Sequence, residues 1–189
     1  MLVCRFFTPG NREEDQAPAR KAFYETALHF GIAQFIEIPT QGDYGYQRAL
    51  CFAWEAARDS TNSLVIVEQD LVLNPRHIEA FDACGCSLCA RAYTIFPKST
   101  MLSKPVYAHR RYTGNQGGLR WIKEPESAAD LVGLGLVRIR YNALVKNDVW
   151  ELLPGAVHHT NCDTALSMNL HARHYNWHIH WPKIEHLHK

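Results

Sequence analysis

Short apolar runs and stretches with helical spacing alternate along the first seventy residues of the chain. The apolar runs are rich in β-branched and aromatic residues, as strands are, whereas the stretches between them space their apolar residues as amphipathic helices do. The pattern predicts strands at 2–7, 34–38 and 64–67, a helix at 19–30 that begins at Pro18 and ends at Gly31, and a helix at 44–58 capped by Asp43. Strands that alternate with helices imply right-handed crossovers, so the predicted fold class is α/β with a mainly parallel sheet.

The third predicted strand is the centre of this pattern, because its apolar run leads directly into two acids. The run at 64–67 is typical of a strand buried on both faces of a parallel sheet, and ligands bind at the carboxyl edge of such sheets. Since strand side chains alternate, we expect Glu68 and Asp70 on one side and Gln69 on the other. Two carboxylates at this edge suit Mg²⁺ or Mn²⁺, although solvated acids before a turn give the same pattern.

The second half of the chain places further elements around a long segment rich in proline and glycine. The pattern predicts a short helix at 74–81, a strand at 87–95, helices at 141–150 and 164–175 and a strand at 177–181. The segment 97–123 is predicted to be a flexible loop. It holds no acid and six basic residues, Lys98, Lys104, Arg110, Arg111, Arg120 and Lys123. It is either a mobile surface loop or a basic flap that closes over a negatively charged ligand such as a diphosphate.

Length and composition predict one domain spanning residues 1–189, which is long enough to bury a core. The formal net charge of +1 gives no clear nucleic-acid signature, and no apolar run is long enough to span a membrane. The first residues have the wrong flanks for a signal peptide, so we expect a cytoplasmic protein. Its six cysteines are then expected to be reduced.

Histidines are concentrated near the end of the chain, where eight of the eleven lie between His158 and His188. Histidine clusters are candidate metal ligands, although most single histidines are surface or packing residues. The spacing predicts three pairs that share a face: His171 with His174 on a helix, His178 with His180 on a strand, and His186 with His188 in the tail.

Three cysteines, Cys84, Cys86 and Cys89, have the spacing of half a zinc site. A zinc site needs four ligands, and no second pair of cysteines or histidines lies nearby in the sequence. Ordinary core and turn cysteines are therefore the favoured interpretation.

Asp163 lies where a late helix is predicted to begin, so it is either a helix cap or a carboxylate aimed at the ligand-bearing edge. Gly133 and Gly135 either let the backbone approach a ligand closely or mark a bend before a strand. The chain contains neither a hydrolase nucleophile elbow nor a glycine-rich phosphate loop with its lysine.

Together these segments resemble a small glycosyltransferase of the GT-A fold, similar to family 2 enzymes. The resemblance is carried by the strand ending at Thr8-Pro9, the strand ending at Glu68-Gln69-Asp70, the segment 133–139, Asn161-Cys162-Asp163 and a late histidine. It implies a single Rossmann-like domain and donor contacts from Thr8, Pro9, Arg48, Glu68, Gln69, Asp70, Gly133, Leu134 and Gly135. It also implies Asp70 with His186 or His188 as ligands of Mn²⁺ or Mg²⁺, and Asp163 as the base of an inverting reaction. The motif here is Glu-x-Asp where the family has Asp-x-Asp, so Glu68 is expected to touch the ribose or sugar.

The function implied is metal-dependent, hexosyltransferase-like transfer of a sugar from a nucleotide-diphosphate sugar, such as a UDP- or GDP-sugar, to an acceptor that the resemblance leaves open. Two alternatives belong to other classes. One is a metal-dependent nucleotidyltransferase or hydrolase that uses the same edge, and the other is a nucleotide-sugar-binding protein without catalysis.

Overall fold

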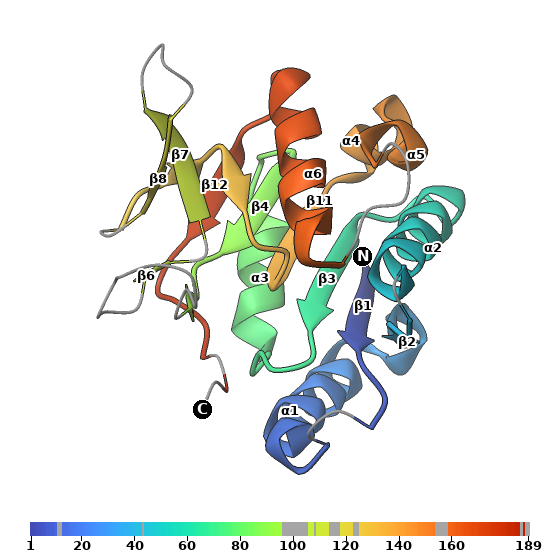
Figure 1. Ribbon diagram of the computed structural model, residues 1–189. Helices are drawn as coiled ribbons and strands as arrows, with labels where there is room; N and C mark the ends of the chain where they lie inside the picture. The colour runs from blue at the N-terminus through green and yellow to red at the C-terminus, as the bar shows by residue number, and fades with distance from the viewer. Residues whose placement is uncertain are drawn as a thin grey trace.

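The computed structural model describes residues 1–10, 13–42, 44–95, 106–107, 109–113, 118–122, 125–153, 159–185 and 187. Its centre is a seven-stranded sheet in the order β2-β1-β3-β11-β4-β12-β9 (Figure 1). The strands are β1 (Leu2–Phe7), β2 (Phe35–Pro39), β3 (Leu64–Glu68), β4 (Leu88–Arg91), β9 (Ala128–Ala129), β11 (Leu136–Ile139) and β12 (Trp177–His180). Strand β1 is parallel to β2 and β3, and β12 is parallel to β4, whereas β11 and β9 run antiparallel to their neighbours. The sheet is mainly parallel, as the alternating pattern predicts.

Helices cover both faces of this sheet (Figure 1). They are α1 (Glu13–Phe30), α2 (Gly45–Asp59), α3 (Pro75–Ala83), α4 (Tyr141–Lys146), α5 (Val149–Leu152) and α6 (His159–Ala172), with a 3₁₀ turn η1 (Ile32–Gln34) after α1. Helices α1 and α3 pack on one face, where Val65 and Val67 of β3 point. Helices α2, α4, α5 and α6 pack on the other face, where Leu64 and Ile66 point. All four strand residues are fully buried, so the prediction of a strand covered on both faces is confirmed.

Two small sheets lie beyond the main one, and they contain part of the segment predicted to be an irregular loop. Strands β5 (Thr94–Ile95) and β6 (Val106–Tyr107) pair with each other, and β7 (His109–Thr113) pairs with β8 (Gly118–Trp121) and β10 (Leu131–Val132). The prediction of an irregular loop is therefore wrong for β6, β7 and β8, and the rest of 97–123 lies outside the described residues apart from Ile122. Arg111 and Arg120 form ion pairs with Glu126, so part of the basic charge is neutralised by an acid just beyond the segment.

Several predicted boundaries are wrong. Helix α1 begins at Glu13, before Pro18, because acids at positions 14 and 15 favour the positive end of a helix dipole. It ends at the predicted place, where Gly31 has a φ of 104°. The helix predicted at 141–150 is two short helices, with Asp148 capping the second by accepting a hydrogen bond from the Trp150 backbone.

The last helix also differs from its prediction. Helix α6 begins at His159, so Asp163 lies after its first turn and not at its start. It ends at Ala172, and His174 beyond it has a φ of 65°, so His171 and His174 do not share a helix face. The predicted cap Asp43 lies outside the described residues. In the described part of the chain no helix is both long enough and apolar enough to cross a bilayer, and the six cysteines are free thiols.

Candidate functional site

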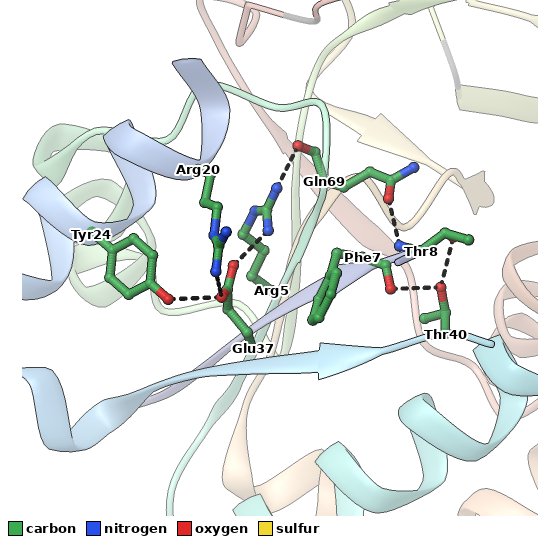
Figure 2. Close-up of polar contacts among 8 residues, drawn as sticks. All are labelled: Arg5, Phe7, Thr8, Arg20, Tyr24, Glu37, Thr40 and Gln69. Carbon is green, nitrogen blue, oxygen red and sulfur yellow. Dashed lines mark hydrogen bonds and ion pairs between the residues drawn. The ribbon is translucent and has the colours of Figure 1, made fainter. Parts of the chain in front are cut away.

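The carboxyl ends of β1 and β3 meet at one edge of the sheet, where a turn follows each strand (Figure 1). Gln69 follows β3 directly, and its side-chain Oε1 accepts a hydrogen bond of 2.7 Å from the backbone N–H of Thr8, which follows β1. The Thr8 hydroxyl lies 3.0 Å from that of Thr40, which in turn donates to the carbonyl oxygen of Phe7 (Figure 2). These bonds fix the chain at the ends of three adjacent strands.

The buried side chain of Arg5 stabilises the same edge of the sheet. Arg5 on β1 forms an ion pair of 2.6 Å with Glu37 on β2, and its other terminal nitrogen donates to the carbonyl oxygen of Gln69 at 3.0 Å (Figure 2). Arg20 and Tyr24 of α1 complete the shell around Glu37. Burial raises the pKa of Glu37, but the hydrogen bonds from Tyr24 and Arg20 outweigh burial and keep this pKa below its usual value. The turn that carries Gln69 and Asp70 is therefore anchored to three elements.

Glu68 is the last residue of β3 and points to the face covered by α2 and α6, because it continues the alternation of Leu64 and Ile66. The hydroxyl of Tyr46 on α2 donates a hydrogen bond of 3.0 Å to its Oε1. Burial and the neighbouring Glu68 and Asp163 carboxylates raise the pKa of Tyr46 well above its usual value. Tyr46 thus remains a neutral donor to Glu68 at every physiological pH.

Tyr93, which follows β4, brings three carboxylates into one neighbourhood. Burial raises the pKa of Tyr93 well above its usual value, and so do the charges of Glu68, Asp163 and Asp70. Three carboxylates that raise the pKa of one buried tyrosine give this region a negative potential, which favours a bound cation.

Asp163 projects from α6 and is largely buried. Burial raises the pKa of its carboxyl group above the usual value, while the backbone N–H of Thr164 and the charge of Arg110 oppose the rise. The Thr164 N–H donates to Oδ1 at 2.6 Å, and Arg110 on β7 reaches the Thr164 hydroxyl at 3.4 Å. A carboxylate with raised proton affinity and an arginine close by is suited to accept a proton.

Asp70 lies in the turn after β3, where the backbone N–H of Leu71 donates to the carbonyl oxygen of Glu68. We expected Glu68 and Asp70 on one side because side chains alternate along a strand. That reasoning is wrong, because the strand ends at Glu68 and does not include Asp70. The end of the chain returns to this turn (Figure 1). The N–H of Leu187 donates to the carbonyl oxygen of Asp70, and the N–H of Val72 donates to that of Glu185.

No family model matches the chain, and no curated protein matches it. Among solved structures, A197 from STIV is similar over 95% of this chain and 82% of its own, with 13% identity and a TM-score of 0.60. A glycosyltransferase involved in the glycosylation of the major capsid of PBCV-1 is similar over 95% of this chain and 81% of its own, with 13% identity and a TM-score of 0.50. A third, CMP:2-keto-3-deoxy-manno-octonic acid synthetase complexed with CTP, covers 95% of this chain and 88% of its own, with 12% identity and a TM-score of 0.47.

The chain has a GT-A-like fold. At this level of identity the similarity establishes the fold alone. Within the GT-A-like fold, the predicted residues that come together at the edge of the sheet are Thr8, Glu68, Gln69, Asp70 and Asp163, linked through Tyr46 and Tyr93.

Three other residues that were predicted to contact the donor have different surroundings. Arg48 is exposed and donates to the carbonyl oxygen of Gln41 at 3.3 Å. Leu134 is buried in the core beneath α2 and α6. A Cβ at Gly135 would lie 2.6 Å from the Tyr93 ring, so this glycine allows Tyr93 to pack against the backbone. His186 and His188 lie outside the described residues.

Sequence reasoning did not identify Tyr46, Tyr93 or Arg110 as parts of this GT-A-like edge. Tyr93 had a usable signal, because it follows an apolar strand in the way Glu68 does. Arg110 was noted only as one basic residue of the loop. Tyr46 carried no signal, since a tyrosine near the start of a helix is common.

A small pocket lies next to Thr8 and is lined by Arg5, Phe7, Thr8, Gln16 and Arg20. Its volume of about 60 Å³ has room for a few water molecules. The pocket is thus too small to hold a nucleotide by itself, and it borders the edge that carries Thr8 and Gln69.

Proposed function

We propose that this protein transfers a sugar from a nucleotide-diphosphate sugar to an acceptor hydroxyl, with inversion at the sugar carbon. The observation that carries the proposal is the end of β3, where Glu68 closes the strand and Asp70 lies in the turn after it, with both carboxylates and Asp163 near enough to raise the pKa of Tyr93. Ligands bind at this edge in open α/β sheets, and the GT-A-like fold supports a donor of the nucleotide-sugar class.

The carboxylates at this edge fit a hard divalent cation, because Mg²⁺ and Mn²⁺ prefer oxygen ligands. Asp70 is the residue that would bind the cation, which would neutralise the departing diphosphate when bound. Glu68, which accepts a hydrogen bond from Tyr46, is the residue proposed to contact a sugar or ribose hydroxyl.

Asp163 serves as the general base in this proposal. It removes the proton from the acceptor hydroxyl as that oxygen bonds to the sugar carbon and the diphosphate leaves. Its raised pKa strengthens the carboxylate as a proton acceptor, and the Thr164 N–H and the charge of Arg110 limit this rise. The Gln69 side chain and Arg5 hold the turn of Asp70 in place on the donor side.

The first test is a thermal-shift screen of UDP-, GDP- and other nucleotide sugars with and without Mn²⁺. A donor present at 100 times its dissociation constant stabilises the fold by about 2.7 kcal/mol. We expect a shift with one class of donor that requires Mn²⁺ and is lost in Asp70→Ala. The matched control is Asp82→Ala, which removes an exposed acid on α3.

Turnover assays then separate the reaction from its alternatives. Transfer requires that the donor release a nucleoside diphosphate in step with glycosylation of an acceptor. Release of pyrophosphate from a nucleoside triphosphate would replace the proposal with nucleotidyl transfer. Donor binding without turnover, across a broad panel of acceptors, would show that the protein binds nucleotide sugars without catalysis.

A further inference from the structure

A group of polar side chains lies on the face of the sheet covered by α3, away from the carboxylate edge. Trp177 and Ile179 of β12 point into the core beneath α2 and α6, so the alternating residues His178 and His180 face α3. The ring of Phe81 on α3 packs edge-on against His180, with 5.3 Å between ring centroids. Two histidines thus lie where a helix would ordinarily cover apolar side chains.

Cys84 completes this group from another part of the chain. It follows α3 directly, at the start of the connection to β4, and β4 pairs with β12. The Sγ of Cys84 and one ring nitrogen each of His178 and His180 all lie within 4.8 Å of one another. The second pair of ligands that the Cys84, Cys86, Cys89 spacing lacked in the sequence is therefore brought in by β12.

One ring nitrogen of His180 is unsatisfied in the described part of the structure. Its Nε2 atom is buried and has no hydrogen-bond partner among the described residues. A buried ring nitrogen without a partner is costly, and a metal ion is one of the few groups that satisfies it.

The three sulfurs near this point are not equivalent. Arg138 donates to the Sγ of Cys89 at 3.0 Å and also to the carbonyl oxygens of Cys84 and Cys86. Cys86 is exposed, whereas Cys89 is buried and its sulfur is held by Arg138. Cys86 is therefore the sulfur that can turn toward Cys84 and the two histidines.

We propose that Cys84, His178 and His180 bind a zinc ion; Cys86 lies outside this group of three ligand atoms and becomes the fourth ligand by turning its exposed thiol toward the ion. Zinc bonds of about 2.0–2.3 Å place tetrahedral ligand atoms about 3.4–3.8 Å apart, so the atoms need to draw together by about 1 Å. Thiolate and imidazole ligands select zinc over the oxygen-seeking Mg²⁺ and Mn²⁺. Two thiolates make the centre neutral beside the cationic Arg138. The ion joins the α3–β4 connection to β12 and has a structural role independent of the carboxylate edge.

The test measures zinc in the purified full-length protein by elemental analysis, after dialysis against a weak chelator. We expect about one zinc per chain. Replacement by Co²⁺ is expected to give the visible bands of a tetrahedral site and thiolate-to-cobalt charge transfer in the near ultraviolet. Stripping the wild-type protein with a strong chelator should lower its unfolding temperature, and added Zn²⁺ should restore it.

Variants assign the ligands. Cys84→Ser and the double variant His178→Ala/His180→Ala are expected to weaken Zn²⁺ binding by about 100-fold or more. Cys86→Ser should retain a tetrahedral cobalt site with weaker charge transfer. The matched control His29→Ala/His174→Asn removes two histidines elsewhere and should bind Zn²⁺ as the wild type does. Asp70→Ala should also keep its zinc, which separates this centre from the donor site.

Three results would overturn the proposal. The first is wild-type protein that neither retains zinc nor is stabilised by added Zn²⁺. The second is an unchanged Zn²⁺ affinity in both ligand variants. The third is a Cys84–Cys86 disulfide in protein purified without reductant and with zinc present, shown by a mass lower by two hydrogens. An unchanged charge-transfer band in Cys86→Ser would remove Cys86 from the ligand set.

Discussion

Burial favours the neutral form of Asp163, whereas the N–H of Thr164 and the charge of Arg110 favour its charged form. Burial prevails, so the folded protein binds this proton more tightly than the unfolded chain does. The ionised form of this group therefore carries a cost in stability. A catalytic base commonly carries such a cost, because strong proton affinity and burial arise together.

Asp163→Asn separates the two consequences of this arrangement. The amide keeps the shape of the side chain but accepts no proton, so turnover should fall by about 10²-fold or more while donor binding is unchanged. The same change removes a buried charge, so the unfolding temperature at pH 7 should rise. This gain should vanish as the pH falls below about 3.9, where the unfolded chain is protonated too.

Unfolding scans from pH 7 to pH 3 and donor titrations check both expectations. Asp59→Asn, at an exposed position at the end of α2, is the control and should change neither quantity. Near wild-type turnover in Asp163→Asn would place the base elsewhere, whereas lost donor binding would assign Asp163 to the donor site.

Arg110 is expected to set the pH at which turnover begins. Turnover requires ionised Asp163, so it should fall as the pH drops through the pKa of this group. Because Arg110 lowers that pKa, Arg110→Met should move the acid limb of the pH–rate profile to higher pH, and Arg110→Lys should keep it near the wild-type position. Arg111 lies on the same strand as Arg110 and forms an ion pair with Glu126, so Arg111→Met should leave the acid limb of the profile unchanged. An acid limb that stays fixed in Arg110→Met would contradict this role.

At the scale of elements, Arg5 connects three strands at the point where they carry the candidate site. It is 2% exposed, pairs with Glu37 on β2 and donates to the carbonyl oxygen of Gln69 after β3. Arg5→Met leaves two acceptors with fewer partners, so the free energy of unfolding should fall by about 1–3 kcal/mol. Urea denaturation of this variant beside Arg58→Met, whose arginine is 39% exposed, measures the difference. An equal effect of the two substitutions would show that the buried network adds nothing.

The start of α3 makes stability depend on pH. Asn74 and His77 cap this helix reciprocally, and burial, then the charge of Arg91, lower the pKa of His77 to about 4. The unfolded chain therefore takes up a proton near pH 6.5 that the folded chain refuses until about pH 4. Stability from this group is present above pH 6.5 and is lost as the pH falls toward 4.

His77→Gln should flatten this dependence. Urea unfolding at pH 7.5, 6 and 5 should show a shallower loss of stability than in the wild type. His29→Gln, on the exposed side of α1, is the control and should keep the wild-type slope.

At the scale of the whole molecule, the local pattern of apolar and polar residues was enough to predict the first three strands and the two helices between them. It also predicted the edge of the sheet at which these strands end. Thr8 and Gln69 come together because the carboxyl ends of parallel strands share one edge, a rule that needs only the strand order. The position of β11 between β3 and β4 has no such local signal, since it depends on long-range pairing. The group of Cys84, His178 and His180 was missed for the same reason, because β12, which is distant in the sequence, pairs with β4.

The return of the chain end to the turn of Asp70 gives the last prediction. Ile184 is buried and its N–H donates to the carbonyl oxygen of Ala92, after which Glu185 and Leu187 pair with Val72 and Asp70. A chain ending at Leu187 keeps these bonds, whereas a chain ending at Ile184 loses two of them and should be less stable by about 1–3 kcal/mol. Because the tail holds the Asp70 turn, the Mn²⁺-dependent donor shift should weaken in the shorter chain only.

His186→Ala in the full-length protein separates an imidazole ligand from this backbone support. If His186 binds the cation, the substitution should weaken the Mn²⁺ response while leaving stability without metal unchanged, since the two backbone bonds persist. If the tail acts only through its backbone, His186→Ala should respond to Mn²⁺ as the wild type does and the chain ending at Ile184 should not. A chain ending at Ile184 that matches the wild type in both stability and Mn²⁺ response would show that the tail contributes nothing to the site.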